Sequence, residues 1–162
     1  MTHPMELAIL RELETLRGKQ IERVVYREAS PEGAARQANH HALDYGVELH
    51  LADAPPFAVI WALANEDERM EVVRGDLSSQ FNTEVVTQDV TDDDAWVPYI
   101  GVPIRATRLR CRRKDQWDAT PDFIRIDFEQ ERSIVIAINA WEGDSVSVFF
   151  LEGTDRCEFE TR

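Results

Sequence analysis

One pattern of apolar residues occurs twice along this chain, and this repeat constrains the fold more than any other feature of the sequence. Apolar residues alternate with polar ones in most of the repeated segments, as they do in half-buried β-strands. Each copy therefore predicts four strands in an antiparallel meander, and we interpret the pair as an internal duplication. The matching segments are 18–27 and 101–110, 47–51 and 124–128, 58–64 and 134–140, and 70–75 and 149–153.

Two four-stranded meanders, each with one apolar face, must bury those faces against each other or within one curved sheet. We expect a mainly β (α+β) protein, built as a sandwich, an open barrel or a strongly bent sheet. A stripe of Met5, Ile9, Leu13 and Leu16 before Gly18 predicts an N-terminal helix that packs on the sheet. The expected organisation is a single domain, 1–162, with the helix at 1–18, the first meander at 19–75, an acidic connection at 76–100 and the second meander at 101–162.

Two shorter segments carry predictions of their own. The Ser30-Pro31 start and the alanines that follow it predict a short helix before Gly46. Residues 155–160 alternate Cys157 and Phe159 with charged residues, which predicts an extension of the last strand or an added edge strand.

Charge limits the classes of partner. The chain has 31 acidic and 18 basic residues, for a net charge of −13. Nucleic acid and anionic membrane surfaces would be repelled by the averaged field, so a general polyanion binder is not expected. A negative surface of this kind favours a basic protein partner, because complementary charge speeds association and rejects wrong partners.

The acidic connection is the first candidate site. Between residues 76 and 100 the chain has several aspartates and no lysine or arginine. A Trp and a Tyr exposed beside carboxylates would form a binding hot spot, whereas buried aromatics would instead anchor the connection to the body. The candidate partner-binding residues are Asp89, Asp92, Asp93, Asp94, Trp96 and Tyr99.

A basic cluster at 105–114, which consists of five arginines and Lys114, is the second candidate site. In a strand, Arg108, Arg110 and Arg112 would point to one face, at intervals of about 6.5–7 Å. Cross-strand pairing with acids such as Asp127 and Glu129 is one interpretation. A site for an acidic ligand is another, because guanidinium groups suit carboxylate and phosphate. Nucleic-acid contact is the third, and the charge of the rest of the chain disfavours it.

Catalytic signals are missing from the sequence. His40 and His41 are adjacent and belong to no spaced set of metal ligands, and no nucleophile motif or phosphate-binding glycine loop occurs. We therefore expect no cofactor and no metal, and binding is favoured over enzymatic activity. The N-terminus has no signal-peptide pattern and no apolar run is long enough for a membrane helix, so we expect a cytoplasmic protein without membrane contact.

These observations favour a small protein that occludes a basic partner, as an immunity protein or antitoxin occludes a bacterial toxin. One alternative is a ligand-binding or enzymatic β-barrel with a cavity between the two halves. A second is an inhibitor that mimics DNA by spacing carboxylates along one face. A third alternative is a homo-oligomer formed through an exposed sheet edge.

Overall fold

The computed structural model describes residues 4–32, 35–64, 67–78, 85–113, 119–138 and 146–153. Helix α1 (Pro4–Glu14) opens the chain, and a single 3-10 turn, η1 (Val97–Tyr99), precedes the second half. Among these residues, no helix is long and apolar enough to span a membrane. The strands are β1 (Ile21–Glu28), β2 (Arg36–Gln37), β3 (His40–Leu43), β4 (Gly46–Leu51), β5 (Phe57–Ala64), β6 (Asp67–Arg74), β7 (Val86–Asp89), β8 (Ile104–Arg113), β9 (Ala119–Phe128), β10 (Arg132–Ile138) and β11 (Val146–Glu152).

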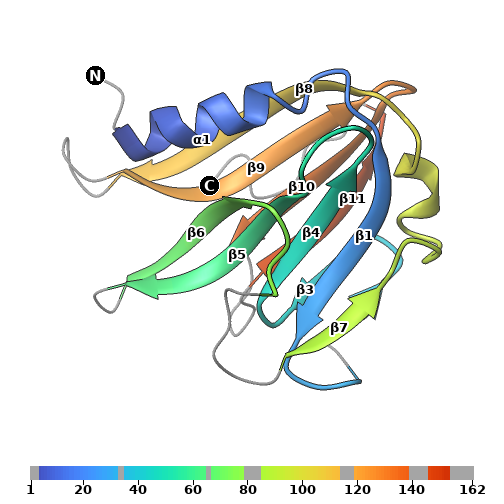
Figure 1. The fold of residues 1–162 in the computed structure, drawn as a ribbon, viewed down its shortest axis with the longest axis horizontal. Coiled ribbons are helices and arrows are strands. Elements are labelled where there is room, and N and C mark those ends of the chain that lie inside the picture. The colour runs from blue at the N-terminus through green and yellow to red at the C-terminus, as the bar shows by residue number, and fades with distance from the viewer. Residues whose placement is uncertain are drawn as a thin grey trace.

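The strands form two antiparallel sheets that face each other, as Figure 1 shows. Sheet A has the order β6-β5-β4-β1-β7 and sheet B the order β2-β3-β11-β10-β9-β8. Apolar side chains from both sheets and from α1 form one core between them. The predicted architecture of two meanders with a packed N-terminal helix is confirmed: β1-β4-β5-β6 is the first meander and β8-β9-β10-β11 is the second.

The backbone repeats between the two meanders. The Gly18 N–H donates to the Ile104 carbonyl at 2.8 Å, and the Gly101 N–H donates to the Ile21 carbonyl at 2.9 Å. Both glycines have positive φ, +79° and +75°, which L side chains rarely adopt. The two contacts are the same contact made in each direction between the two halves.

A bulge occurs at the same place in both meanders. The register of β1 against β4 shifts at Glu22, and the register of β8 against β9 shifts at Arg105. An extra residue of this kind bends a strand and increases its twist. The match makes Ile104 equivalent to Ile21 and Phe128 equivalent to Leu51, and positions counted from these residues are called equivalent below.

The sequence repeat misaligned the third strands of the two meanders, β5 and β10, by one residue. Phe57 and Val59 of β5 point into the core, as do Ile134 and Ile136 of β10, so Phe57 is equivalent to Ile134. The sequence repeat instead matched Ala58 with Ile134, although Ala58 lies on the outer face of sheet A. A shift of one residue exchanges the two faces of a strand, and both of these strands are apolar on both faces.

Two connections also differ from their predictions. The segment before Gly46 is a β-hairpin, β2–β3, rather than a helix, because β3 pairs with β11 and extends sheet B. The acidic connection contains a further strand, β7, which pairs with β1. Since β6 and β7 lie at opposite edges of sheet A, the connection between them must cross that sheet. The prediction for residues 155–160 lies outside the described residues.

Candidate functional sites

The acidic loop, residues 89–97, has four carboxylates, of which Asp89 and Asp93 hold its shape. Asp89, Asp92 and Asp94 are exposed. Asp89 accepts hydrogen bonds from the Thr91 backbone and hydroxyl at 3.0 and 2.6 Å and from Arg23 at 2.7 Å. The hydrogen bonds from Thr91 and then from Arg23 lower the pKa of Asp89 to about 2. Asp93 accepts from the Ala95 N–H at 2.9 Å, so its side chain also closes a turn of the loop.

Trp96 and Tyr99 are core residues, with 0% and 2% of their surface exposed. They are therefore not part of an exposed hot spot, and their burial fits the alternative in which they anchor the connection. The Trp96 ring stands edge-on to Phe150, with centroids 5.1 Å apart. The Tyr99 hydroxyl shares its one hydrogen between the backbone carbonyls of Ser133 and Leu151, whose oxygens lie 3.1 and 3.2 Å away. Both aromatics tie the loop to sheet B, while Val97 between them is 54% exposed.

A buried hydrogen-bonded chain lies beneath the loop. The Trp96 indole N–H donates to the Tyr26 hydroxyl at 2.6 Å. Because the Tyr26 oxygen accepts this bond, the Tyr26 hydroxyl hydrogen is donated to Nδ1 of His41, 2.7 Å away. This assigns the ring hydrogen of neutral His41 to Nε2, which faces an Asp93 carboxylate oxygen at 3.8 Å. The hydrogen bonds between Trp96, Tyr26 and His41 therefore join β1, β3 and the acidic loop.

Burial determines the ionisation of Tyr26 and His41. It lowers the pKa of His41 to about 4 and raises the pKa of Tyr26 above its ordinary value. The neutral forms of both side chains are thus the forms that the core holds at neutral pH. The sequence offered His41 only as a candidate metal ligand beside His40, and no sequence prediction placed Tyr26 in the core, because alternation in 21–26 does not say which face is buried. Among the described residues, no three His, Cys, Asp or Glu side chains are arranged to hold a metal ion.

The arginine strand is β8, at the edge of sheet B. Arg110 is paired with Asp122, with nitrogen–oxygen distances of 3.1 and 3.2 Å, and its guanidinium lies over the Phe123 ring. Arg112 reaches the same carboxylate at 3.7 Å but has a side chain 58% exposed, and Arg108 is exposed. Cross-strand pairing therefore accounts for Arg110. Its acid is Asp122, the extra residue of β9 between the partners of Arg110 and Cys111, rather than the expected Asp127 or Glu129.

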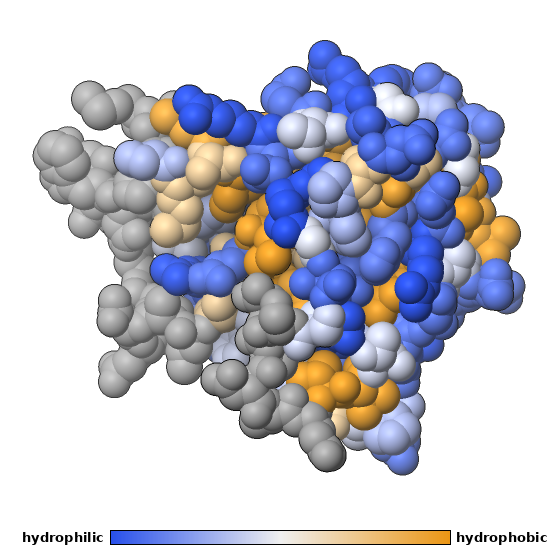
Figure 2. All heavy atoms as spheres, viewed as in Figure 1, coloured by the Kyte–Doolittle hydropathy of each residue, from blue (hydrophilic) through white to orange (hydrophobic). Residues whose placement is uncertain are grey.

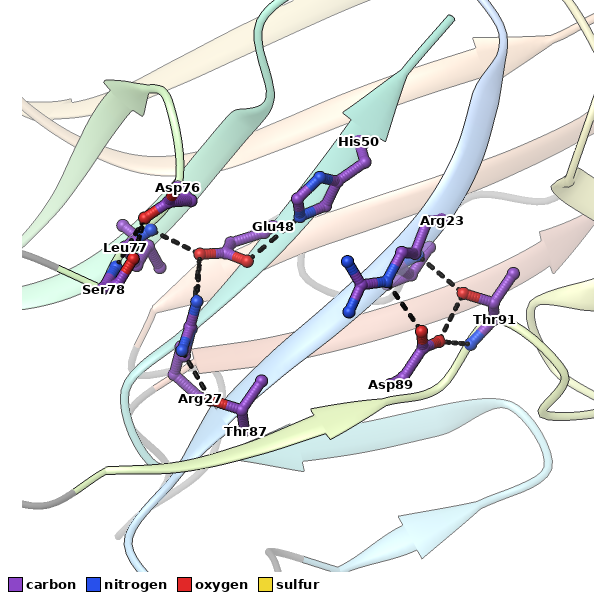
Figure 3. A network of polar contacts seen from close by, with 11 residues as sticks. Arg23, Arg27, Glu48, His50, Asp76, Leu77, Ser78, Thr87, Asp89 and Thr91 are labelled. Carbon is purple, nitrogen blue, oxygen red and sulfur yellow. Dashed lines mark hydrogen bonds and ion pairs between the residues drawn. The ribbon is translucent and has the colours of Figure 1, made fainter.

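A buried carboxylate marks the outer face of sheet A, the face that points away from sheet B. Glu48 is 1% exposed and accepts from Arg27 at 2.8 Å, from His50 at 3.2 Å and from the Leu77 backbone N–H, as Figure 3 shows. The Leu77 side chain packs onto Ala58 on the same face. Glu48 therefore holds the start of the β6–β7 connection on the sheet that it crosses.

The equivalent residue of sheet B has the opposite charge. It is Arg125, which is 5% exposed and donates to Asp127 at 2.8 Å. The same reversal occurs at the bulges, where Glu22 is equivalent to Arg105. At these two matching positions the halves thus have opposite charge: Glu22 and Glu48 in β1 and β4, and Arg105 and Arg125 in β8 and β9.

The structure shows a surface groove of about 240 Å³ between α1 and β6. Met5, Ile9 and Met70 are among the side chains that line it, and Figure 2 shows tan and orange apolar atoms at the upper left, where α1 meets β6. The space between the sheets is filled by the shared core in the described part of the chain. A ligand-binding barrel requires a cavity between the two halves. The groove lies instead between α1 and β6.

Comparisons with known proteins give no identity. No family model, no curated protein and no solved structure matches this sequence.

Proposed function

We propose that this chain is a small acidic protein-binding protein that occludes a basic partner, in the manner of an immunity protein or an antitoxin. The observation that carries the proposal is the construction of the acidic loop. Asp92 and Asp94 project from it, while Trp96 and Tyr99 are buried in the core beneath it. Because the loop is already ordered, binding would require little further loss of conformational freedom.

The contact would combine charge with one apolar residue. Asp92 and Asp94 would attract lysines or arginines of the partner, and the exposed Val97 would pack against an apolar surface between them. The net charge of −13 would steer the encounter over a longer range and make it depend on salt. Asp89 and Asp93 would serve the interface indirectly, since each accepts a backbone hydrogen bond that holds the loop in shape. The β-barrel and DNA-mimic alternatives remain predictions.

The test is capture from a native lysate at low salt, with the identity and isoelectric point of each retained protein determined by mass spectrometry. We expect one basic protein in stoichiometric amount, released at high salt. The Asp92→Lys, Asp94→Lys variant should lose it. The control Glu129→Lys, Glu131→Lys makes the same charge change in the β9–β10 turn, where both residues are exposed, and should keep it. Equal retention by both variants, or no stoichiometric basic protein at all, would refute the proposal.

A further inference from the structure

Sheet A includes a strand added next to β1, and the matching place in sheet B has no described strand. β7 pairs with β1 in antiparallel register, with Val25 opposite Asp89 and Arg27 opposite Thr87. The strand equivalent to β1 is β8, which pairs with β9 on one side. Among the described strands none pairs with β8 on its other side. In the described part of the chain, one half therefore has an added strand at this edge and the other half does not.

The way in which β7 binds shows what such an edge recognises. Besides its ladder of backbone pairs, β7 meets two arginines of β1, as Figure 3 shows. Asp89 bonds to Arg23 at 2.7 Å, and the Thr87 hydroxyl accepts a hydrogen bond from Arg27. Alternate side chains of the added strand thus place acceptor oxygens against guanidinium groups on the outer face of the sheet.

β8 has three arginines on the face where β1 has two. Arg110 is equivalent to Arg27 and Arg108 replaces the apolar Val25, whereas Ala106 replaces Arg23 and Arg112 lies beyond the position that matches the end of β1. Among the described residues, Asp122 pairs with Arg110 and Arg112, and Asp127 pairs with Arg125. Arg108 and Arg112 are exposed.

The rest of the strand suits an added neighbour. β8 is ten residues long. At its first residue the Ile104 N–H and carbonyl already bond to Lys19 and Gly18, so an extended peptide would pair with the residues from Ala106 onward. Helix α1 contributes Ile9 and Leu13 to the core and so packs on the inner side of the sheets, in front of β8 in Figure 1. A second copy of this chain is a poor occupant, because antiparallel pairing of two β8 strands would set arginines against arginines.

We propose that β8 is a docking edge for an extended acidic segment of a partner protein, which adds to sheet B as an antiparallel strand. Carboxylates at alternate positions of that segment, two residues apart, meet Arg108, Arg110 and Arg112. This surface is separate from the acidic loop, and the proposal does not depend on the function proposed above. A long nucleic acid is disfavoured as occupant by the net charge of −13, whereas a short acidic segment brings few charges into that field.

The test uses a fluorescein-labelled ten-residue peptide that alternates Glu with Thr and Val, titrated with the full chain and followed by fluorescence anisotropy. The Arg108→Glu, Arg112→Glu variant should bind at least tenfold more weakly. Its control, Arg11→Glu, Arg17→Glu, makes the same charge change at exposed positions on and just after α1, and should bind within twofold of the unmodified chain. Equal weakening in both variants would show that binding depends on the net charge of the protein and not on β8, and would overturn the proposal.

Strand pairing is tested with the unmodified chain, so this arm does not depend on the folding of a variant. A peptide with the same sequence but N-methylated at alternate residues keeps its carboxylates and loses half of its backbone donors. We expect its affinity to fall at least tenfold, and unchanged affinity would overturn the docking-edge geometry. Failure of the full chain to bind the first peptide, or tighter binding of a single-stranded oligonucleotide of equal charge, would also overturn the proposal.

Discussion

Removal of one hydroxyl, in Tyr26→Phe, should destabilise the protein far more than the size of the change suggests. The side-chain volume is nearly unchanged, so no cavity forms. The Trp96 indole N–H and the Nδ1 atom of His41 would both lose their partner within the core, where Tyr26 and Trp96 are 0% exposed. Each buried group left without a partner costs about 1–3 kcal/mol. The free energy of unfolding should therefore fall by about 2–5 kcal/mol, a large share of the roughly 5–15 kcal/mol typical of a domain.

The assay is urea denaturation followed by tryptophan fluorescence, with the slope m compared to show that both proteins unfold to the same extent. The control is Tyr99→Phe, which removes a hydroxyl bonded only to backbone carbonyls, at 3.1 and 3.2 Å. A carbonyl oxygen has two lone pairs and tolerates the loss better, so this variant should lose about 1 kcal/mol. A loss below about 1 kcal/mol for Tyr26→Phe, or one no larger than that of Tyr99→Phe, would refute the reasoning.

Three further predictions concern stability. Burial lowers the pKa of His41 from 6.5 to about 4, so the unfolded chain binds a proton there in this pH range and the folded chain does not. The free energy of unfolding should therefore fall by up to about 3 kcal/mol as the pH drops from 6.5 to 4, and urea titrations of His41→Gln should show no such loss from this site. In Gly46→Ala, the new Cβ would lie 2.7 Å from a backbone oxygen, so thermal melts should show a loss of about 1–3 kcal/mol. Gly153→Ala, with nothing within 4 Å, adds only the strain of φ +63° and should lose about 1 kcal/mol. Glu48→Ala removes the acceptor of Arg27 and of the Leu77 N–H, so the free energy of unfolding, measured by urea denaturation, should fall by about 3–5 kcal/mol. The control Glu71→Ala should lose at most about 1 kcal/mol, because its partner Arg69 is a third exposed.

The strands of the two meanders were predictable because their apolar residues alternate and the pattern recurs. The exception shows where this signal ends. Residues 57–64 are apolar on both faces, so period-two alternation does not say which face is buried, and the match with β10 slipped by one residue. Only the observed pairs, Val59 with Val47 and Ile136 with Ile124, fix the register.

The candidate sites depended on contacts that are remote in sequence. β7 is four residues long and largely polar, and it is a strand because β1 offers it an edge. β3 is a strand because of β11, which follows it by about a hundred residues. The sequence named Trp96 and Tyr99 as either an exposed pair or an anchor, and the choice depended on Tyr26, His41 and Phe150 lying beneath the loop. Local propensity has no information about such partners.

The reciprocal hydrogen bonds of Gly18 and Gly101 have a consequence for how the protein folds. Each meander satisfies a backbone N–H of the other, and the apolar faces of both share one core. In a solenoid, a repeat contacts only its neighbours along the array, and parts of the array can unfold separately. Here neither copy has a complete set of partners without the other, so the duplicated chain is one cooperative unit, in which a destabilising substitution in either half weakens both.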